Sequence, residues 1–195
     1  PEYMQTTVRE HRASAQPGRS CADCHMPQLA TSDGPALRSH AFAASRDLAW
    51  MREAFTVTAR RPAPDRVELS LDLHEDRVGH ALPTGDLLRR LLVTVAVTGV
   101  ARRTAPQRRY LARHWKHARP GKGPGVRTLD HDDRLGVGDD PRVLTFNLDP
   151  ADAALPVQWR VRYERVEAFV GPGEDGARVV GGLDLFEGTL PALAQ

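Results

Sequence analysis

Hydrophobic and polar residues alternate along several segments in the last two thirds of the chain. Val67, Leu69, Leu71 and Leu73 alternate with polar neighbours, which is typical of a strand with one buried face. The same period of two recurs at residues 91–98, 142–148, 157–166 and 178–185. Proline and glycine turns separate some of these segments. The pattern predicts a mainly β fold, namely an immunoglobulin-like antiparallel β-sandwich over residues 65–195.

The first sixty residues follow a different pattern. Helical runs are predicted at Arg9–Ser14 and Ala43–Thr58. The stretch between them, residues 16–34, is expected to be irregular because prolines and glycines interrupt it. Two prolines in the segment 61–64 predict a linker, since proline disfavours both helix and central strand. A small irregular or α-helical segment over residues 1–60 is therefore expected in front of the sandwich.

The composition excludes some classes of protein. Hydrophobic residues make up 41% of the 195-residue chain and charged residues 27%, as in an ordinary soluble domain. The net charge of +2 is too small to indicate a nucleic-acid partner. No run approaches the roughly 20 apolar residues of a membrane-spanning helix. The chain opens on Pro1 rather than Met, which predicts a mature or truncated product.

Residues 101–127 fit neither part. They contain nine lysines and arginines, with Tyr110 and Trp115 between them. One interpretation is a basic, solvated insertion between strands. The other is a docking surface for an acidic partner, because basic patches speed encounter.

The chemistry of the sequence centres on Cys21-Ala22-Asp23-Cys24-His25, the attachment signature for haem c. Two thiols three positions apart can each form a thioether to one of the two vinyl groups on one haem edge. His25 then coordinates the iron from the proximal side. The attachment reaction takes place outside the cytoplasm in bacteria, so the motif predicts an exported, periplasmic or otherwise extracytoplasmic protein.

Three alternatives explain the motif less well. A disulfide between Cys21 and Cys24 would close a very short loop with poor geometry. A zinc site needs further ligands at ordinary spacing, and the chain has no other cysteine. A thioredoxin-like redox pair would need a βαβ context, which the sequence lacks.

The iron then needs a sixth ligand or an open position. His40 is the first candidate, because the chain between His25 and His40 is long enough to wrap the haem edge. His80, in the Gly79–Gly85 segment, could cap the haem from the sandwich, and His11 is a third candidate. The remaining histidines lie in polar or basic contexts and are expected to be structural or exposed; they are His74, His114, His117 and His131.

Three apolar residues complete the predicted surroundings. Met26 follows His25 directly, so it stays on the proximal side of the haem and cannot reach across the ring. Met51 is expected to fill a core, and Phe42 to pack on the haem.

The motif, followed by Met26-Pro27 and by Ser39-His40-Ala41-Phe42, resembles the last haem segment of bacterial multihaem cytochromes c of the cytochrome c554-like type. Gly79-His80-Ala81-Leu82-Pro83-Thr84-Gly85 is similar to the start of the sandwich that follows that segment. Asp133-Arg134-Leu135 and Val161-Arg162-Tyr163 also fit, so the resemblance spans residues 2–185.

The resemblance implies His25 as proximal ligand and a histidine, most simply His40, as distal ligand or as ligand to a neighbouring haem. It also implies other haem proteins or redox subunits as partners. Family members usually carry several attachment motifs, whereas this chain has one. The sequence favours an electron carrier. A peroxidase or nitrogen-oxide reductase with an open distal site and a docking subunit of a cytochrome complex remain as alternatives.

Overall fold

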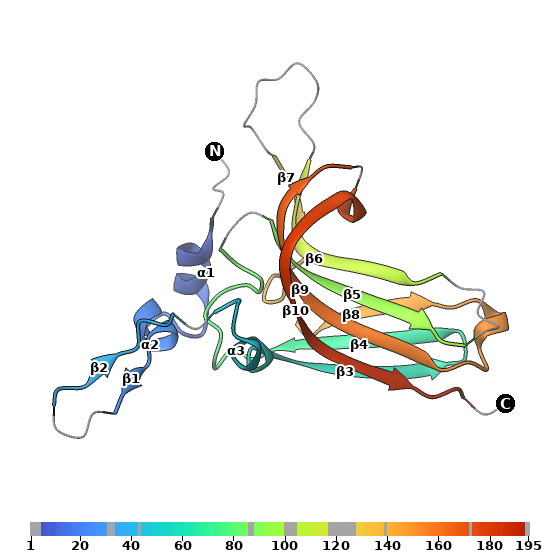
Figure 1. Ribbon diagram of the computed structural model, residues 1–195, viewed down its shortest axis with the longest axis horizontal. Coiled ribbons are helices and arrows are strands. Elements are labelled where there is room, and N and C mark those ends of the chain that lie inside the picture. Colours follow the sequence, from blue (N-terminus) through green and yellow to red (C-terminus); the bar gives the residue numbers. More distant parts are fainter. Residues whose placement is uncertain are drawn as a thin grey trace, which may run out of the picture.

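A computed structural model describes residues 5–30, 34–42, 44–85, 88–99, 105–116, 128–138, 140–171 and 173–193. Two antiparallel sheets make up most of it (Figure 1). The larger sheet has the strand order β10-β9-β5-β6-β7. Its strands are β5 (Arg89–Val97), β6 (Gln107–Lys116), β7 (Thr128–Asp132), β9 (Val157–Phe169) and β10 (Ala177–Leu190). The smaller sheet has the order β3-β4-β8, with β3 at Phe55–Ala63, β4 at Arg66–Leu73 and β8 at Arg142–Asn147. The mainly β prediction is confirmed.

The two sheets enclose a single hydrophobic core. The alternating residues of β4, Val67, Leu69 and Leu71, are fully buried. They belong to one cluster with Val93 of β5 and Val161 of β9, which also have no exposed surface. The apolar residues of the alternating pattern are therefore those that face the core between the two sheets.

The N-terminal elements lie together at one end of the sheets (Figure 1). In chain order they are α1 (Thr7–Ala13), α2 (Cys21–His25), the short strands β1 (Gln28–Leu29) and β2 (Leu37–Arg38), and α3 (Leu48–Arg52). Two 3-10 turns, η1 (Pro150–Asp152) and η2 (Glu174–Gly176), lie on either side of β9 in the chain. No helix in the described part of the chain is long and apolar enough to span a membrane.

The predicted helix over residues 43–58 is wrong in its second half. Helix α3 ends at Arg52, and β3 begins at Phe55. Phe55 is fully buried and pairs with Leu73 of β4. Sheet pairing therefore prevails over the helical spacing of the apolar residues.

The predicted linker is also wrong, because β3 continues through Pro62 to Ala63. Proline is tolerated there since β3 is an edge strand, and its register with β4 shifts between Arg60 and Ala63. The Arg61 side chain turns inward and donates to the carbonyl oxygens of Pro64, Ala153 and Leu155.

The basic segment 101–127 is not simply a solvated insertion. Its residues 107–116 form β6, which lies inside the larger sheet between β5 and β7. Leu111 of β6 is 1% exposed and belongs to the core. Residues 101–104 and 117–127 lie outside the described residues.

Candidate functional site

Helix α2 presents the two cysteines on one side. Ser20 begins it with a capping box: the Ser20 hydroxyl accepts from the Asp23 amide (3.2 Å), and Asp23 accepts from the Ser20 amide (2.8 Å). Cys21 and Cys24 are free thiols, the first exposed and the second partly exposed. Because residues three apart share a helix face, both thiols are available to one flat ligand.

Arg38 of β2 fixes the far end of the same helix. It donates to the carbonyl oxygens of Ala22 (2.9 Å) and Met26 (3.2 Å) and to the carboxylate of Asp23 (2.6 Å). The Ser20 amide and hydroxyl, together with Arg38, lower the pKa of Asp23 to about 2. A helix of five residues, too short to be stable by itself, is thus held at both ends.

Three aromatic rings lie around His25. Phe42 stacks on it with ring centroids 4.8 Å apart, and Trp50 of α3 is tilted at 5.8 Å. The ring of His80, from the loop between β4 and β5, lies 6.2 Å away and within 5° of parallel. The structure therefore brings Phe42 and His80 to His25 as the sequence allowed, and it adds Trp50, which sequence reasoning missed.

The position of Trp50 follows from a local signal. The Asp47 side chain caps α3 by accepting from the Trp50 amide at 3.0 Å. An aspartate directly before an apolar helical run is a signal for the start of a helix. It does not reveal that this helix faces His25.

The His80 side chain has one nitrogen fixed. Its Nδ1 lies 3.0 Å from the Ala81 carbonyl oxygen, which can only accept, so Nδ1 carries the hydrogen and Nε2 is left as the coordinating atom. Burial lowers the pKa of His80, despite the hydrogen bond to Ala81. The imidazole is therefore neutral at neutral pH, as a metal ligand has to be.

Hydrogen bonds fix the loop that carries His80 on both sides of this residue. Leu82 and Leu135 exchange two backbone hydrogen bonds of 3.0 Å. The His11 ring of α1 meets the Gly79 carbonyl oxygen at 3.1 Å. An added Cβ at Gly79 would lie 2.5 Å from His11 Nδ1, so this close approach requires glycine.

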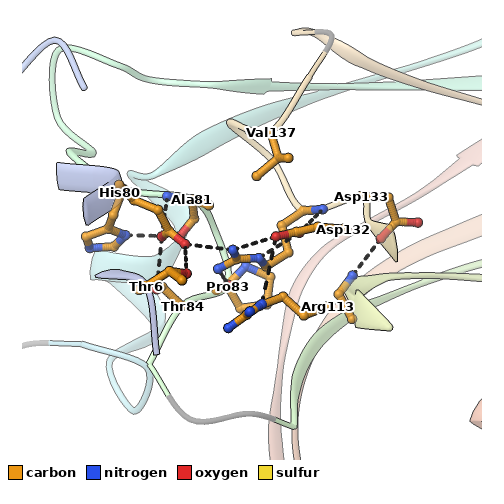
Figure 2. A network of polar contacts seen from close by, with 12 residues as sticks. Thr6, His80, Ala81, Pro83, Thr84, Arg113, Asp132, Asp133 and Val137 are labelled. Atoms are coloured by element: carbon orange, nitrogen blue, oxygen red, sulfur yellow. Dashed lines mark hydrogen bonds and ion pairs between the residues drawn. The ribbon is translucent and has the colours of Figure 1, made fainter. Parts of the chain in front are cut away.

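A buried ion network connects α1, this loop and the sandwich (Figure 2). Glu10 of α1 accepts from the Ala81 amide (3.2 Å) and from Arg134 (2.7 Å). Arg134, 3% exposed, also binds Asp132 of β7 (2.8 Å) and the Pro83 carbonyl oxygen (3.0 Å). The network holds His80 in place relative to the N-terminal segment.

The other sequence candidates lie in different surroundings. His40 is exposed, and the ring contacts of His25 within the described residues do not include it. Both ring nitrogens of His11 face carbonyl oxygens, those of Gly79 and Arg19. Met26 is half-buried at the end of α2.

Two residues bear on how the site is built. Met51 lies in the core at 4% exposed, as expected. Phe42 has a φ of 48°, a left-handed conformation that a bulky residue adopts only where its surroundings impose it. Backbone strain thus coincides with the stacking on His25.

The N-terminal segment leaves apolar side chains uncovered. No residue of α1 or α2 is buried. Among the described residues, five of the nine large hydrophobic side chains that are exposed lie before residue 50, namely Val8, Leu29, Leu37, Phe42 and Leu48. A segment this small cannot form a core of its own, so its exposed apolar side chains are suited to contact a large apolar cofactor.

The spacing of His25 and His80 fits an iron between them. A metal–imidazole bond of about 2 Å puts the ring centroid roughly 3 Å from the ion, so two axial imidazoles have centroids about 6 Å apart. The observed distance is 6.2 Å. The residues present therefore fit a haem attached to Cys21 and Cys24.

Comparison with known proteins gives one structural relative and no family. No family model matches the chain, and no curated protein does. The structure is similar to a penta-heme cytochrome c552 from Thermochromatium tepidum, with a TM-score of 0.64 and 18% identity. The match covers 96% of this chain and 51% of that one. The chain thus has a fold found in a multihaem cytochrome, and it spans about half the length of that relative.

Proposed function

We propose that this chain is a c-type cytochrome unit that transfers electrons through one haem, attached to Cys21 and Cys24 and ligated by His25 and His80. The parallel imidazoles, 6.2 Å apart, are the observation that carries the proposal. A haem in this position would supply a one-electron iron couple.

The protein residues around the haem have separate roles. Cys21 and Cys24 would hold it covalently, and the Ala81 carbonyl oxygen orients the His80 imidazole through Nδ1. Phe42 and Trp50 flank His25 and limit the access of water to that side. Two imidazole ligands leave no open coordination position, which favours electron transfer over catalysis.

The proposal assigns the distal role to His80, whereas the sequence pattern alone favours His40. The His80 ring is parallel to that of His25, and its backbone is anchored to α1 and to the sandwich. His40, exposed on the N-terminal segment, is instead available to a neighbouring protein.

The proposal extends to fold, partners and location. The sheet orders β10-β9-β5-β6-β7 and β3-β4-β8 support an immunoglobulin-like arrangement. Other haem proteins are the expected partners, since a single haem conducts over a long range only when others lie close by. Haem attachment implies a location outside the cytoplasm, and the basic character of the segment 101–127 extends the proposal to an acidic partner.

The test is optical and EPR spectroscopy of the haem-loaded protein. We expect a low-spin spectrum that becomes high-spin in His80→Ala and stays low-spin in the matched variant His40→Ala. A high-spin change in His40→Ala alone would move the distal role to His40. A high-spin unmodified protein that binds cyanide readily would favour the enzyme, and a chain that binds no haem would exclude both functions.

A further inference from the structure

A second histidine cluster lies on the larger sheet, apart from the cysteine motif. His114 of β6 and His131 of β7 are direct cross-strand partners. Their rings are stacked, with centroids 4.1 Å apart and planes 12° apart. Asp133, directly after β7, lies beside them, and its carboxylate is 3.0 Å from His114 Nε2.

The three side chains converge on one point. A ligand atom from each of His114, His131 and Asp133 lies within 4.8 Å of the others. Asp133 is held in place by the Ala112 amide, which donates to its carboxylate at 2.8 Å. Of the three side chains, that of His131 is exposed, whereas those of His114 and Asp133 are partly buried.

Each imidazole is oriented by a carboxylate behind it. His114 Nδ1 lies 3.1 Å from Glu174 of η2, and His131 Nδ1 lies 3.1 Å from Asp130. The carboxylates accept hydrogen bonds, so both Nδ1 atoms carry a hydrogen and the Nε2 atoms are the ones that face the cluster. His114 Nε2 donates to Asp133 and becomes a ligand when an ion replaces its hydrogen. A carboxylate behind each histidine is the outer shell that metal-binding histidines usually have.

We propose that His114, His131 and Asp133 bind a divalent transition-metal ion such as Zn²⁺. Two imidazoles and one carboxylate suit zinc, copper or nickel, whereas magnesium and calcium prefer oxygen ligands alone. Three protein ligands leave a fourth position for water or for a group from a partner.

The local charge favours a cation. The carboxylates of Asp130, Asp133 and Glu174 all contact the two rings. Two cations partly offset them, because Glu174 is also paired with Arg90 at 2.9 Å and Asp130 with Lys116 at 3.6 Å.

The test is calorimetric titration of the haem-loaded protein with Zn²⁺ at neutral pH. In that form both thiols are bound to haem as thioethers, so they do not compete for Zn²⁺. We expect one ion per chain. His131→Ala should weaken binding by about tenfold or more, because it removes a ligand but leaves the buried pairs of His114 intact. Absence of binding, or equal binding by His131→Ala, would overturn the proposal.

Two further variants separate this site from incidental surface binding. Glu174→Gln should weaken Zn²⁺ binding by about 10- to 100-fold, as outer-shell substitutions do. His74→Ala, which removes a histidine outside the cluster, should leave it unchanged. With Cu²⁺ as the probe, the EPR spectrum should show coupling to two nitrogens, and coupling to none would contradict the two-histidine site.

Discussion

At the scale of single residues, Arg134 places a charged guanidinium in the interior, where it needs carboxylate partners. It is 3% exposed and forms ion pairs with Glu10 (2.7 Å) and Asp132 (2.8 Å). Burial would lower the pKa of Arg134, but these two carboxylates raise it. Removing one partner of such a network leaves the others buried and uncompensated.

We therefore predict that Arg134→Met lowers the free energy of unfolding by about 3 kcal/mol, measured by denaturant titration. The matched control is Arg77→Met, which breaks an exposed pair with Glu53 and should cost less than about 1 kcal/mol. Equal losses in the two variants would show that the buried network adds no special stability.

His114 makes stability depend on pH. Asp133 and Glu174 raise its pKa from 6.5 to about 10 against the effect of burial, and His131 is the other titratable group stacked on it. The folded state therefore holds a proton that the unfolded state releases above pH 6.5. The stabilisation is complete below pH 6.5 and is lost as the pH rises towards 10.

We expect the free energy of unfolding, measured with a metal chelator present, to fall between pH 6.5 and about 10. His114→Gln should remove most of that slope. An unchanged slope in the variant would assign the pH dependence to other groups.

The sequence defines some site residues and leaves others open for a physical reason. Cys21, Cys24 and His25 lie within five residues of the chain, so spacing alone is enough to propose haem attachment there. The choice between His40 and His80 depends on how the loop after β4 folds back onto α2, which no local pattern encodes. The His114–His131 cluster depends in the same way on the register of β6 with β7.

At the scale of elements, alternation predicts strands whose outward face is polar and whose inward face is aliphatic. It predicts β4, β5, β8, β9 and β10, and it misses β3, β6 and β7. The arginines of β6 pack over aromatic rings, with Arg109 5.5 Å from the Phe146 ring centroid and Arg113 4.6 Å from that of Trp115. In the sequence alone, arginines that pack over rings cannot be told from the arginines of a solvated loop.

The role of β6 as an internal strand can be tested at Leu111. Leu111→Ala should lower the free energy of unfolding by about 2–5 kcal/mol, because it opens a cavity in the core. Val143→Ala, at a residue of β8 that is 53% exposed, is the control and should cost well under half as much. A small loss at Leu111 in denaturant titration would mean that β6 contributes little to the core.

At the scale of the whole molecule, the sandwich has its own core and the N-terminal segment has none. The buried hydrophobic residues of the described chain begin at Met51. The segment 5–30 is instead joined to the sandwich by polar contacts, through Glu10 to Ala81 and Arg134. The sequence separates the two parts by their patterns, but it cannot reveal this junction, because Glu10 and Arg134 look like ordinary surface charges.

Glu10 therefore connects the stability of the N-terminal segment to the position of His80, the proposed haem ligand. Burial would raise the pKa of Glu10, but hydrogen bonds from Thr6, Arg134 and the Ala81 amide lower it, so the carboxylate is charged at neutral pH. Glu10→Ala removes the anchor of the Ala81 amide, beside His80. Loss of a charged, partly buried partner lowers the local stability by about 1–3 kcal/mol. Amide hydrogen exchange in α1 and in residues 79–85 should therefore become faster by about tenfold or more.

The consequence for the proposed cytochrome is a coupled change at the iron. Glu10→Ala should show faster exchange in α1 together with a partial rise of the high-spin signal, because His80 is then less firmly positioned. Glu75→Ala, at an exposed site, should change neither. Faster exchange with an unchanged spin state would mean that α1 docks independently of the haem, whereas a change in both would make the N-terminal segment, the haem and the sandwich one cooperative unit.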